Sequence, residues 1–149
     1  MKTSNIPNPR FLELANKLGN LVSRVSALAE KYGLKEKKGI SLLSKKLQSE
    51  ISEYIEKLQF DKAIQVIIRF TDQTNEYIQG KKPWVSQDSQ VLYEASNAIK
   101  DIAILLSSFL PETSEKIAKT FNFEISLKSL NSPLKISKIK KSEILFKKI

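Results

Sequence analysis

Apolar residues recur every three or four positions through most of this chain, and that spacing constrains its fold more than any other feature. The first such stretch places its apolar side chains on one face of a helix: Phe11, Leu14, Leu18, Leu21, Val25, Leu28 and Tyr32. Asn8 is a suitable N-cap, Pro9 suits the first helical position, and Gly33 supplies a C-terminal stop. The sequence therefore predicts an amphipathic helix over residues 9–32.

The same spacing predicts further helices over residues 42–58, 61–79, 89–109 and 111–120. Asp61 is expected to cap the third of the five and Gly80 to close it, while Pro111 opens the last. Residues 80–84 (GKKPW) are expected to form a turn or loop, because Pro83 disfavours a helical Lys82. Amphipathic helices joined by short connections pack as a bundle. We therefore expect an all-α fold, an antiparallel helical bundle of four to five helices.

Residues 121–149 differ from the rest, because lysines there alternate with apolar residues that lack a helical period: Leu134, Ile136, Ile139, Ile144, Leu145, Phe146 and Ile149. A helix lying on a membrane surface is one interpretation, but Pro133 and the broken period argue against it. We expect a domain formed by residues 1–120 and an extended C-terminal tail, 121–149, that packs back on the bundle with its lysines in water.

The chain contains neither histidine nor cysteine. This excludes disulfides, the usual catalytic triads and thiolate or imidazole zinc sites. The carboxylate pairs Glu50/Glu53 and Glu112/Glu115 stand at helical spacing among lysines, which is typical of a solvated helix face. No apolar run reaches the roughly 20 residues that cross a bilayer. We expect a cytoplasmic chain that has no catalytic residues and no metal of its own.

The charge balance indicates a polyanionic partner. Lysine and arginine number 25 against 16 acidic residues, which gives a net charge of +9. Such an excess favours phosphate contacts and the release of counterions from nucleic acid. Lysine-rich proteomes also produce basic proteins without such a partner, so the charge alone does not establish one.

Asn16, Asn20 and Arg24 form a polar column on the first predicted helix, one turn apart. Amide and guanidinium groups offer the paired, directional hydrogen bonds that read base edges. Gly19 beside them is a residue that tolerates close approach to the backbone. The plainer alternative, which the spacing alone favours, is that the column faces water or caps a neighbouring element.

The only tryptophan, Trp84, follows two lysines just after the third predicted helix. An indole beside cations is a stacking platform for an unpaired base, with the lysines on its phosphates. The alternative is that Trp84 fills a gap in the bundle core, as most single tryptophans do. The local sequence does not favour either interpretation.

Several segments, in the right order, resemble the anticodon-binding domain of methionyl-tRNA synthetases, which are class I aminoacyl-tRNA synthetases. They are residues 18–25 (LGNLVSRV), 75–78 (NEYI), 82–84 (KPW), 102–106 (IAILL), 109–111 (FLP), 115–121 (EKIAKTF) and 143–146 (EILF). The resemblance covers nearly the whole chain. The asparagine column and the Pro-Trp pair are its most specific parts.

The resemblance implies that Asn20 and Arg24 contact a CAU anticodon, with Asn16 supporting them one turn earlier. It also implies that Trp84 stacks on an anticodon base and that Pro83 fixes its loop. The family often has an acidic or other polar residue at the position of Gln79, so Gln79 keeps hydrogen-bonding capacity with a different donor pattern. The implied partners are tRNA with a CAU anticodon and the catalytic domain of the synthetase, and no membrane.

The resemblance further implies a methionine-tRNA ligase whose catalytic domain is absent from this chain. Any ATP, methionine or zinc binding is then expected in residues outside it, in a longer protein or a separate chain. Residues 135–138 (KISK) are similar to a catalytic loop of the family, but no nucleotide-binding fold precedes them, and we interpret that match as chance. Two alternatives remain open: a general RNA-binding helical module and a protein-interaction bundle.

Overall fold

The computed structural model describes residues 9–36, 45–126, 128–130, 132–135 and 138–140. Within them the chain is helical and has no strand, which confirms the all-α fold. The elements are α1 (Pro9–Tyr32), α2 (Lys45–Glu56), α3 (Phe60–Lys81), α4 (Pro83–Ser86), α5 (Ser89–Leu106) and α6 (Pro111–Phe121). Five of these are full helices, and α4 is a single turn of four residues.

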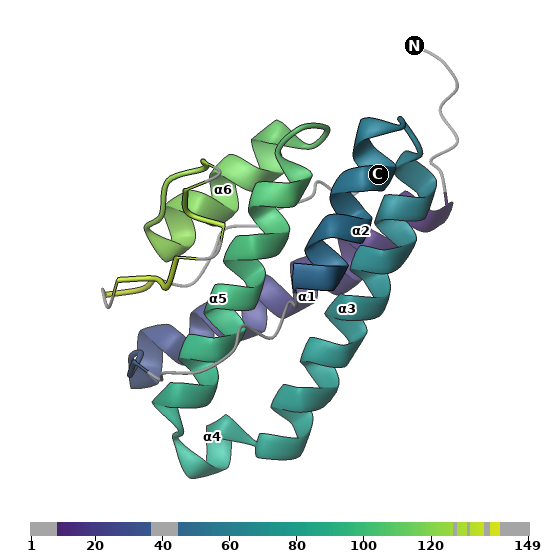
Figure 1. Cartoon of the computed structure of the whole chain (residues 1–149). Helices are drawn as coiled ribbons and strands as arrows, with labels where there is room; N and C mark the ends of the chain where they lie inside the picture. Colours follow the sequence, from purple (N-terminus) through teal and green to yellow (C-terminus); the bar gives the residue numbers. More distant parts are fainter. Residues whose placement is uncertain (1–8, 37–44, 127, 131, 136–137, 141–149) are drawn as a thin grey trace.

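Helices that follow one another in the chain run in opposite directions, as an antiparallel bundle requires (Figure 1). The end of α1 meets the start of α5, where the backbone N–H of Lys35 donates to the carbonyl of Ser89 at 3.2 Å. The hydroxyl of Ser114 on α6 donates to the carbonyl of Ala103 on α5 at 2.8 Å. Helix α1 crosses behind α3 and α5 and packs extensively on both. The pair α1 and α3, separated by α2 in sequence, is therefore brought together by the bundle.

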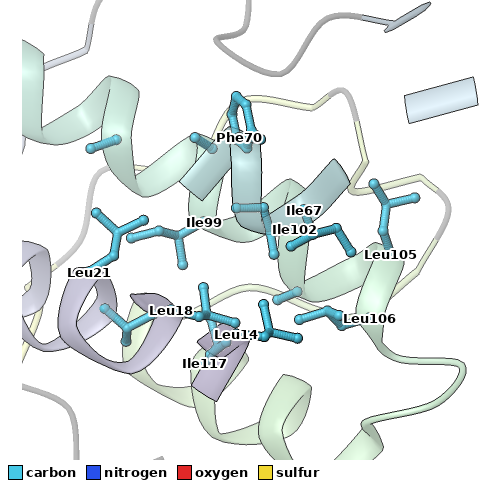
Figure 2. Close-up of a cluster of buried hydrophobic side chains, with 14 of the residues drawn as sticks. Leu14, Leu18, Leu21, Ile67, Phe70, Ile99, Ile102, Leu105, Leu106 and Ile117 are labelled. Carbon is cyan, nitrogen blue, oxygen red and sulfur yellow. The ribbon is translucent and has the colours of Figure 1, made fainter. Parts of the chain in front are cut away.

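The core lies where α1, α3, α5 and α6 meet (Figure 2). Its fully buried side chains include Leu14, Leu18, Leu21, Ile67, Ile99, Ile102, Leu106 and Ile117. The first three are positions of the predicted apolar face of α1. Burying each such side chain contributes about 1.5–3 kcal/mol relative to leaving it in water. The apolar spacing thus fixes which face of each helix points inward.

The predicted ends of the third helix are wrong on both sides. Asp61 lies in the first turn of α3 rather than at its N-cap, which is Gln59. Gly80 lies inside the helix, which continues to Lys81 and is closed by Lys82 in a left-handed conformation, φ 47°. The N–H of Lys82 donates to the carbonyl of Ile78 at 2.9 Å. The stop comes from Pro83, which keeps the residue before it out of the helical region.

The other helix bounds differ less from prediction. Helix α1 has the predicted bounds, and α6 is one residue longer. Helix α5 ends at Leu106, not at 109, because the N–H and the hydroxyl of Ser107 both bond to the carbonyl of Ile104 and tighten the turn. Helix α2 ends at Glu56, and Leu58 follows with a positive φ of 59°. The predicted start of that helix, at residue 42, lies outside the described residues.

The described part of the tail lies against α5 and α6. The hydroxyl of Tyr93 donates to the carbonyl of Leu134 at 2.7 Å, and the N–H of Leu134 donates to Oδ1 of Asn97 at 2.9 Å. Leu134 and Ile139 are buried. Ile136, Ile144, Leu145, Phe146 and Ile149, also expected to pack inward, lie outside the described residues. The division at residue 120 stays a prediction.

Candidate nucleic-acid interface

A polar pocket lies between α1 and α3. Its volume is about 600 Å³, it is open to solvent, and it is lined by Asn20, Ser23, Arg24, Asn75, Glu76 and Gln79. The first three come from α1 and the last three from α3. Each of these helices turns its apolar face to the core and leaves this polar edge beside the other helix. The pocket is therefore a product of how the two helices pack, not of either helix alone.

Helices α1 and α3 run in the same direction, and two contacts fix their register. Lys17 Nζ contacts Asp72 Oδ2 at 2.8 Å, and Arg24 Nη1 donates to Gln79 Oε1 at 3.4 Å. Both pairs join residues 55 apart in sequence, and the second pair lies two helical turns beyond the first. The two pairs bracket the pocket, with Asn20 and Asn75 between them.

Ion pairs cluster around Lys17, at one end of the contact between α1 and α3. Lys17 also contacts Glu13, one turn earlier on α1, at 2.9 Å. Hydrogen bonds to Asp72 and Glu13 raise the pKa of the Lys17 ammonium. The lysine joins α1 to α3 just beside the pocket.

Trp84 lies next to the other end of the pocket. The guanidinium carbon of Arg24 is 5.6 Å from the centroid of the indole ring, within cation–π range. Trp84 is half-buried and packs against the core. Its backbone carbonyl accepts a hydrogen bond from the hydroxyl of Tyr32 at 3.5 Å. The tryptophan is thus neither a full core plug nor a free platform, and part of its ring remains accessible.

The segment that carries Trp84 is a single helical turn, where the sequence predicted a turn or loop, and Lys82 before it is outside the helical region as expected. Pro83 is the buried first residue of α4, and Lys82 and Gln87, at either end, both have positive φ angles. The turn is thus flanked on both sides by residues in the left-handed region, and its first residue is packed in the interior. Asp88 follows at once as the N-cap of α5, accepting from the N–H groups of Gln90 and Val91. Trp84 is therefore held between two long helices.

Tyr77 fixes the end of α3 against α5. Its hydroxyl donates to Oε1 of Glu94 at 2.5 Å. Burial, and then this hydrogen bond, raise the pKa of the Tyr77 phenol above its ordinary value. The phenol remains a donor at neutral pH, so this contact holds the helix turn that carries Gln79.

The predicted site residues are brought together unequally. Asn20, Arg24 and Gln79 line the pocket, and Trp84 touches it through Arg24. Pro83 is buried at the start of α4 and does not line the pocket. Asn16 is exposed and does not line the pocket, because Lys17 and Asp72 fill the contact between α1 and α3 at that turn of the helix. Its supporting role stays a prediction.

Three lining residues were not predicted: Ser23, Asn75 and Glu76. Asn75 and Glu76 stand one turn before Gln79 on α3, and this spacing was the available signal. Ser23 precedes Arg24 and gives no signal without the neighbouring helix. The pocket therefore offers amide, hydroxyl, guanidinium and carboxylate groups, a set suited to base edges. Among the described residues no group of side chains could hold a metal ion.

The sequence matches the protein family described as the anticodon-binding domain of tRNA ligase over residues 37–148, well over half of the chain. The chain belongs to this family. The match begins after α1 and thus omits one wall of the pocket. This anticodon-binding domain also contains no helix, within the described residues, long and apolar enough to cross a membrane.

Its relatives confirm the resemblance to methionyl-tRNA synthetases. The methionine–tRNA ligase of Caldanaerobacter subterraneus subsp. tengcongensis is 31% identical over an alignment of 161 residues, covering 92% of this chain and 25% of that protein. That of Clostridium acetobutylicum is 33% identical, with the same coverage. That of Methanococcus maripaludis is 32% identical over 85% of this chain and 21% of its own length.

The anticodon-binding domain spans about a quarter of the length of the curated relatives it matches. An alignment that covers 92% of the chain must include most of α1, which the family match omits. The relatives therefore extend over both walls of the pocket.

Proposed function

We propose that this domain recognises the CAU anticodon of tRNA as part of a methionine–tRNA ligase, and that it does so in the pocket between α1 and α3 and on Trp84. The observation that carries the proposal is the position of Arg24. This side chain bonds to Gln79 in the polar pocket and lies over the indole of Trp84. A hydrogen-bonding surface and a stacking surface thus meet at one residue, as recognition of an unstacked base requires.

The lining groups match a cytosine edge in kind. Cytosine offers an exocyclic amine donor beside acceptor atoms. The Gln79 amide oxygen and the Glu76 carboxylate are acceptors, and the Arg24 guanidinium, 3.4 Å from Gln79, is a donor. A base with the reverse pattern leaves these groups unpaired, and unpaired polar groups supply large discrimination.

The catalytic step belongs to other residues. We propose that ATP and methionine are bound by a catalytic domain outside this chain, and that anticodon binding here orients the tRNA toward it. The cytoplasm, where tRNA is charged, is the proposed location. The chain alone is expected to bind tRNA without charging it.

The decisive experiment compares two tRNAs that differ only in the anticodon, CAU and a changed one, each titrated with the 149-residue chain at two salt concentrations. The wild type is expected to prefer CAU. Trp84→Ala is expected to weaken CAU binding by about 1–3 kcal/mol, the typical value of one base–aromatic stack. Val85→Ala, at an exposed neighbour, is the matched control, and circular dichroism checks the fold of each variant.

Each other result favours a different function. Equal binding to both tRNAs would indicate a general RNA-binding helical module. Absence of binding at either salt concentration would indicate a protein-interaction bundle. Unchanged affinity of a folded Trp84→Ala variant would remove Trp84 from the site.

A further inference from the structure

One stretch of the tail carries only positive charges, and hydrogen bonds hold its described backbone. Between Glu124 and Glu143 the sequence has lysines but no acidic residue. We name four of them, Lys128, Lys135, Lys138 and Lys140, the tail lysines. All four are exposed. Within the part of the chain that the structure describes, none of them forms an ion pair.

Hydrogen bonds from the bundle hold the backbone that carries these lysines. Lys100 on α5, itself buried, donates from Nζ to the carbonyls of Ser129 and Ser132. Tyr93 and Asn97 bond to the backbone of Leu134, and Asn122 Nδ2 donates to the carbonyl of Lys138 at 3.2 Å. These contacts use main-chain atoms of the tail and leave the tail lysines' side chains pointing to solvent.

The buried and charged positions alternate. Leu134 and Ile139 point inward, while Lys135, Lys138 and Lys140 are exposed. Like charges held along one segment repel one another, and an anion that binds them relieves this repulsion. Because these hydrogen bonds from the bundle already hold the described backbone at Leu134 and Lys138, binding there requires little further loss of backbone entropy.

The tail lysines differ chemically from the pocket. The pocket has directional groups that distinguish bases, whereas an ammonium is a point charge suited to phosphate. The surfaces also differ in position. Figure 1 shows the tail beside α5 and α6, on the other side of α5 from α3. A ligand that reaches both must be long and carry repeated negative charges.

We propose that the tail lysines form a second RNA-contacting surface, which holds the phosphate backbone irrespective of base sequence. The repeated phosphates of an RNA strand fit charges that are spread along an extended segment better than a compact acidic protein patch does. This inference rests on the proposed function only in taking RNA as the ligand, and it does not depend on CAU preference.

The test replaces Lys135, Lys138 and Lys140 together by glutamine in the full chain. The matched control replaces Lys35, Lys45 and Lys46, which are also exposed, so the net charge falls equally. Dissociation constants for the CAU tRNA and the anticodon-changed tRNA are measured across a series of salt concentrations. Each lost phosphate contact lowers the slope of log affinity against log salt by about 0.7–0.9. We expect the tail variant to lose about 2–3 from the slope for both tRNAs, with an unchanged preference between them.

The two proposals fail separately. Equal slopes in the tail variant and the control variant would overturn the tail surface, and an acidic protein partner would give this result. If the tail variant has a lower slope than the control variant while the wild type shows no anticodon preference, the tail surface is upheld and CAU recognition is contradicted. Circular dichroism of both variants confirms that an altered slope comes from a folded chain.

Discussion

Single backbone conformations decide where the helices of this domain end. Lys82 and Leu58 adopt positive φ angles that cost a side-chain-bearing residue about 1–2 kcal/mol, yet each follows a helix end. Gly33 has a φ of 80° and ends α1, as predicted. Gly80, expected to do the same for α3, is an ordinary helical residue. The glycine that requires its conformational freedom is therefore Gly33.

Substitution by alanine should have opposite effects at these two glycines. Gly80→Ala is expected to raise the free energy of unfolding by about 0.5–1 kcal/mol, because a Cβ there meets no atom and alanine favours helix. Gly33→Ala is expected to lower it by about 1 kcal/mol or more, because its φ strains any L-residue. Urea unfolding measures both. A loss of stability in Gly80→Ala would contradict the continuous helix through Lys81.

Residue spacing found the site only in part. Asn20 and Arg24 were visible as a column on one helix, but spacing alone favoured a solvent-facing role for them. Their opposition to Asn75 and Gln79 depends on the register of α1 against α3, which is set by long-range core packing. A local pattern carries no information about that register, so Ser23 was missed. Chemistry singled out Trp84 but left it between a stacking platform and a core residue, and the resemblance to a family favoured the first.

At the level of elements, local end signals predicted the bounds of α1 but misplaced both ends of α3. Helix α1 has a proline at its start and a glycine after its end, and its bounds agree. The end of α5 was misplaced because the apolar period continues into the turn that follows. Phe109 fits that period, yet it lies in the turn. Its ring centroid is 5.3 Å from that of Phe60. Periodicity reports packing against the core, and a partly buried turn residue such as Phe109 satisfies it as well as a helical one.

The start of α5 depends on one carboxylate. Asp88 accepts from the N–H of Gln90 at 3.0 Å and of Val91 at 3.3 Å. Asp88→Ala is expected to lower the free energy of unfolding by about 1 kcal/mol, the usual cost of a lost N-cap, whereas Asp88→Asn retains most of it. Denaturant unfolding of the three chains tests this expectation. Equal losses of unfolding free energy in both variants would show that the N-cap hydrogen bonds do not supply this stability.

For the whole molecule, the tail is part of the folded unit rather than an appendage. Lys100 and Asp101 form a buried ion pair at 3.2 Å, and Lys100 also bonds to the tail backbone. A buried lysine needs such partners, because an unpaired charge in the interior is very unfavourable. The tail carbonyls thus satisfy a charge on α5, and bundle and tail depend on each other.

Removing this lysine charge should therefore release the tail. Lys100→Met leaves Asp101 without that cation, and breaking one side of a buried pair costs about 3–5 kcal/mol. We expect unfolding at lower urea and faster tryptic cleavage at the tail lysines. Lys119→Met, at an exposed lysine, is the control and should change stability by less than about 0.5 kcal/mol. Wild-type cleavage rates in Lys100→Met would show that the tail is held without it.

The common register of α1 and α3 has a consequence for how such domains diverge. Lys17 with Asp72, and Arg24 with Gln79, are couples separated by the same 55 positions, although a whole helix lies between them. A substitution at one member changes the surroundings of the other, so the two sites are expected to covary through evolution. Insertions between the helices would lengthen that interval without uncoupling the partners. The polar contacts between α1 and α3 can therefore change as compensated pairs while the bundle stays the same.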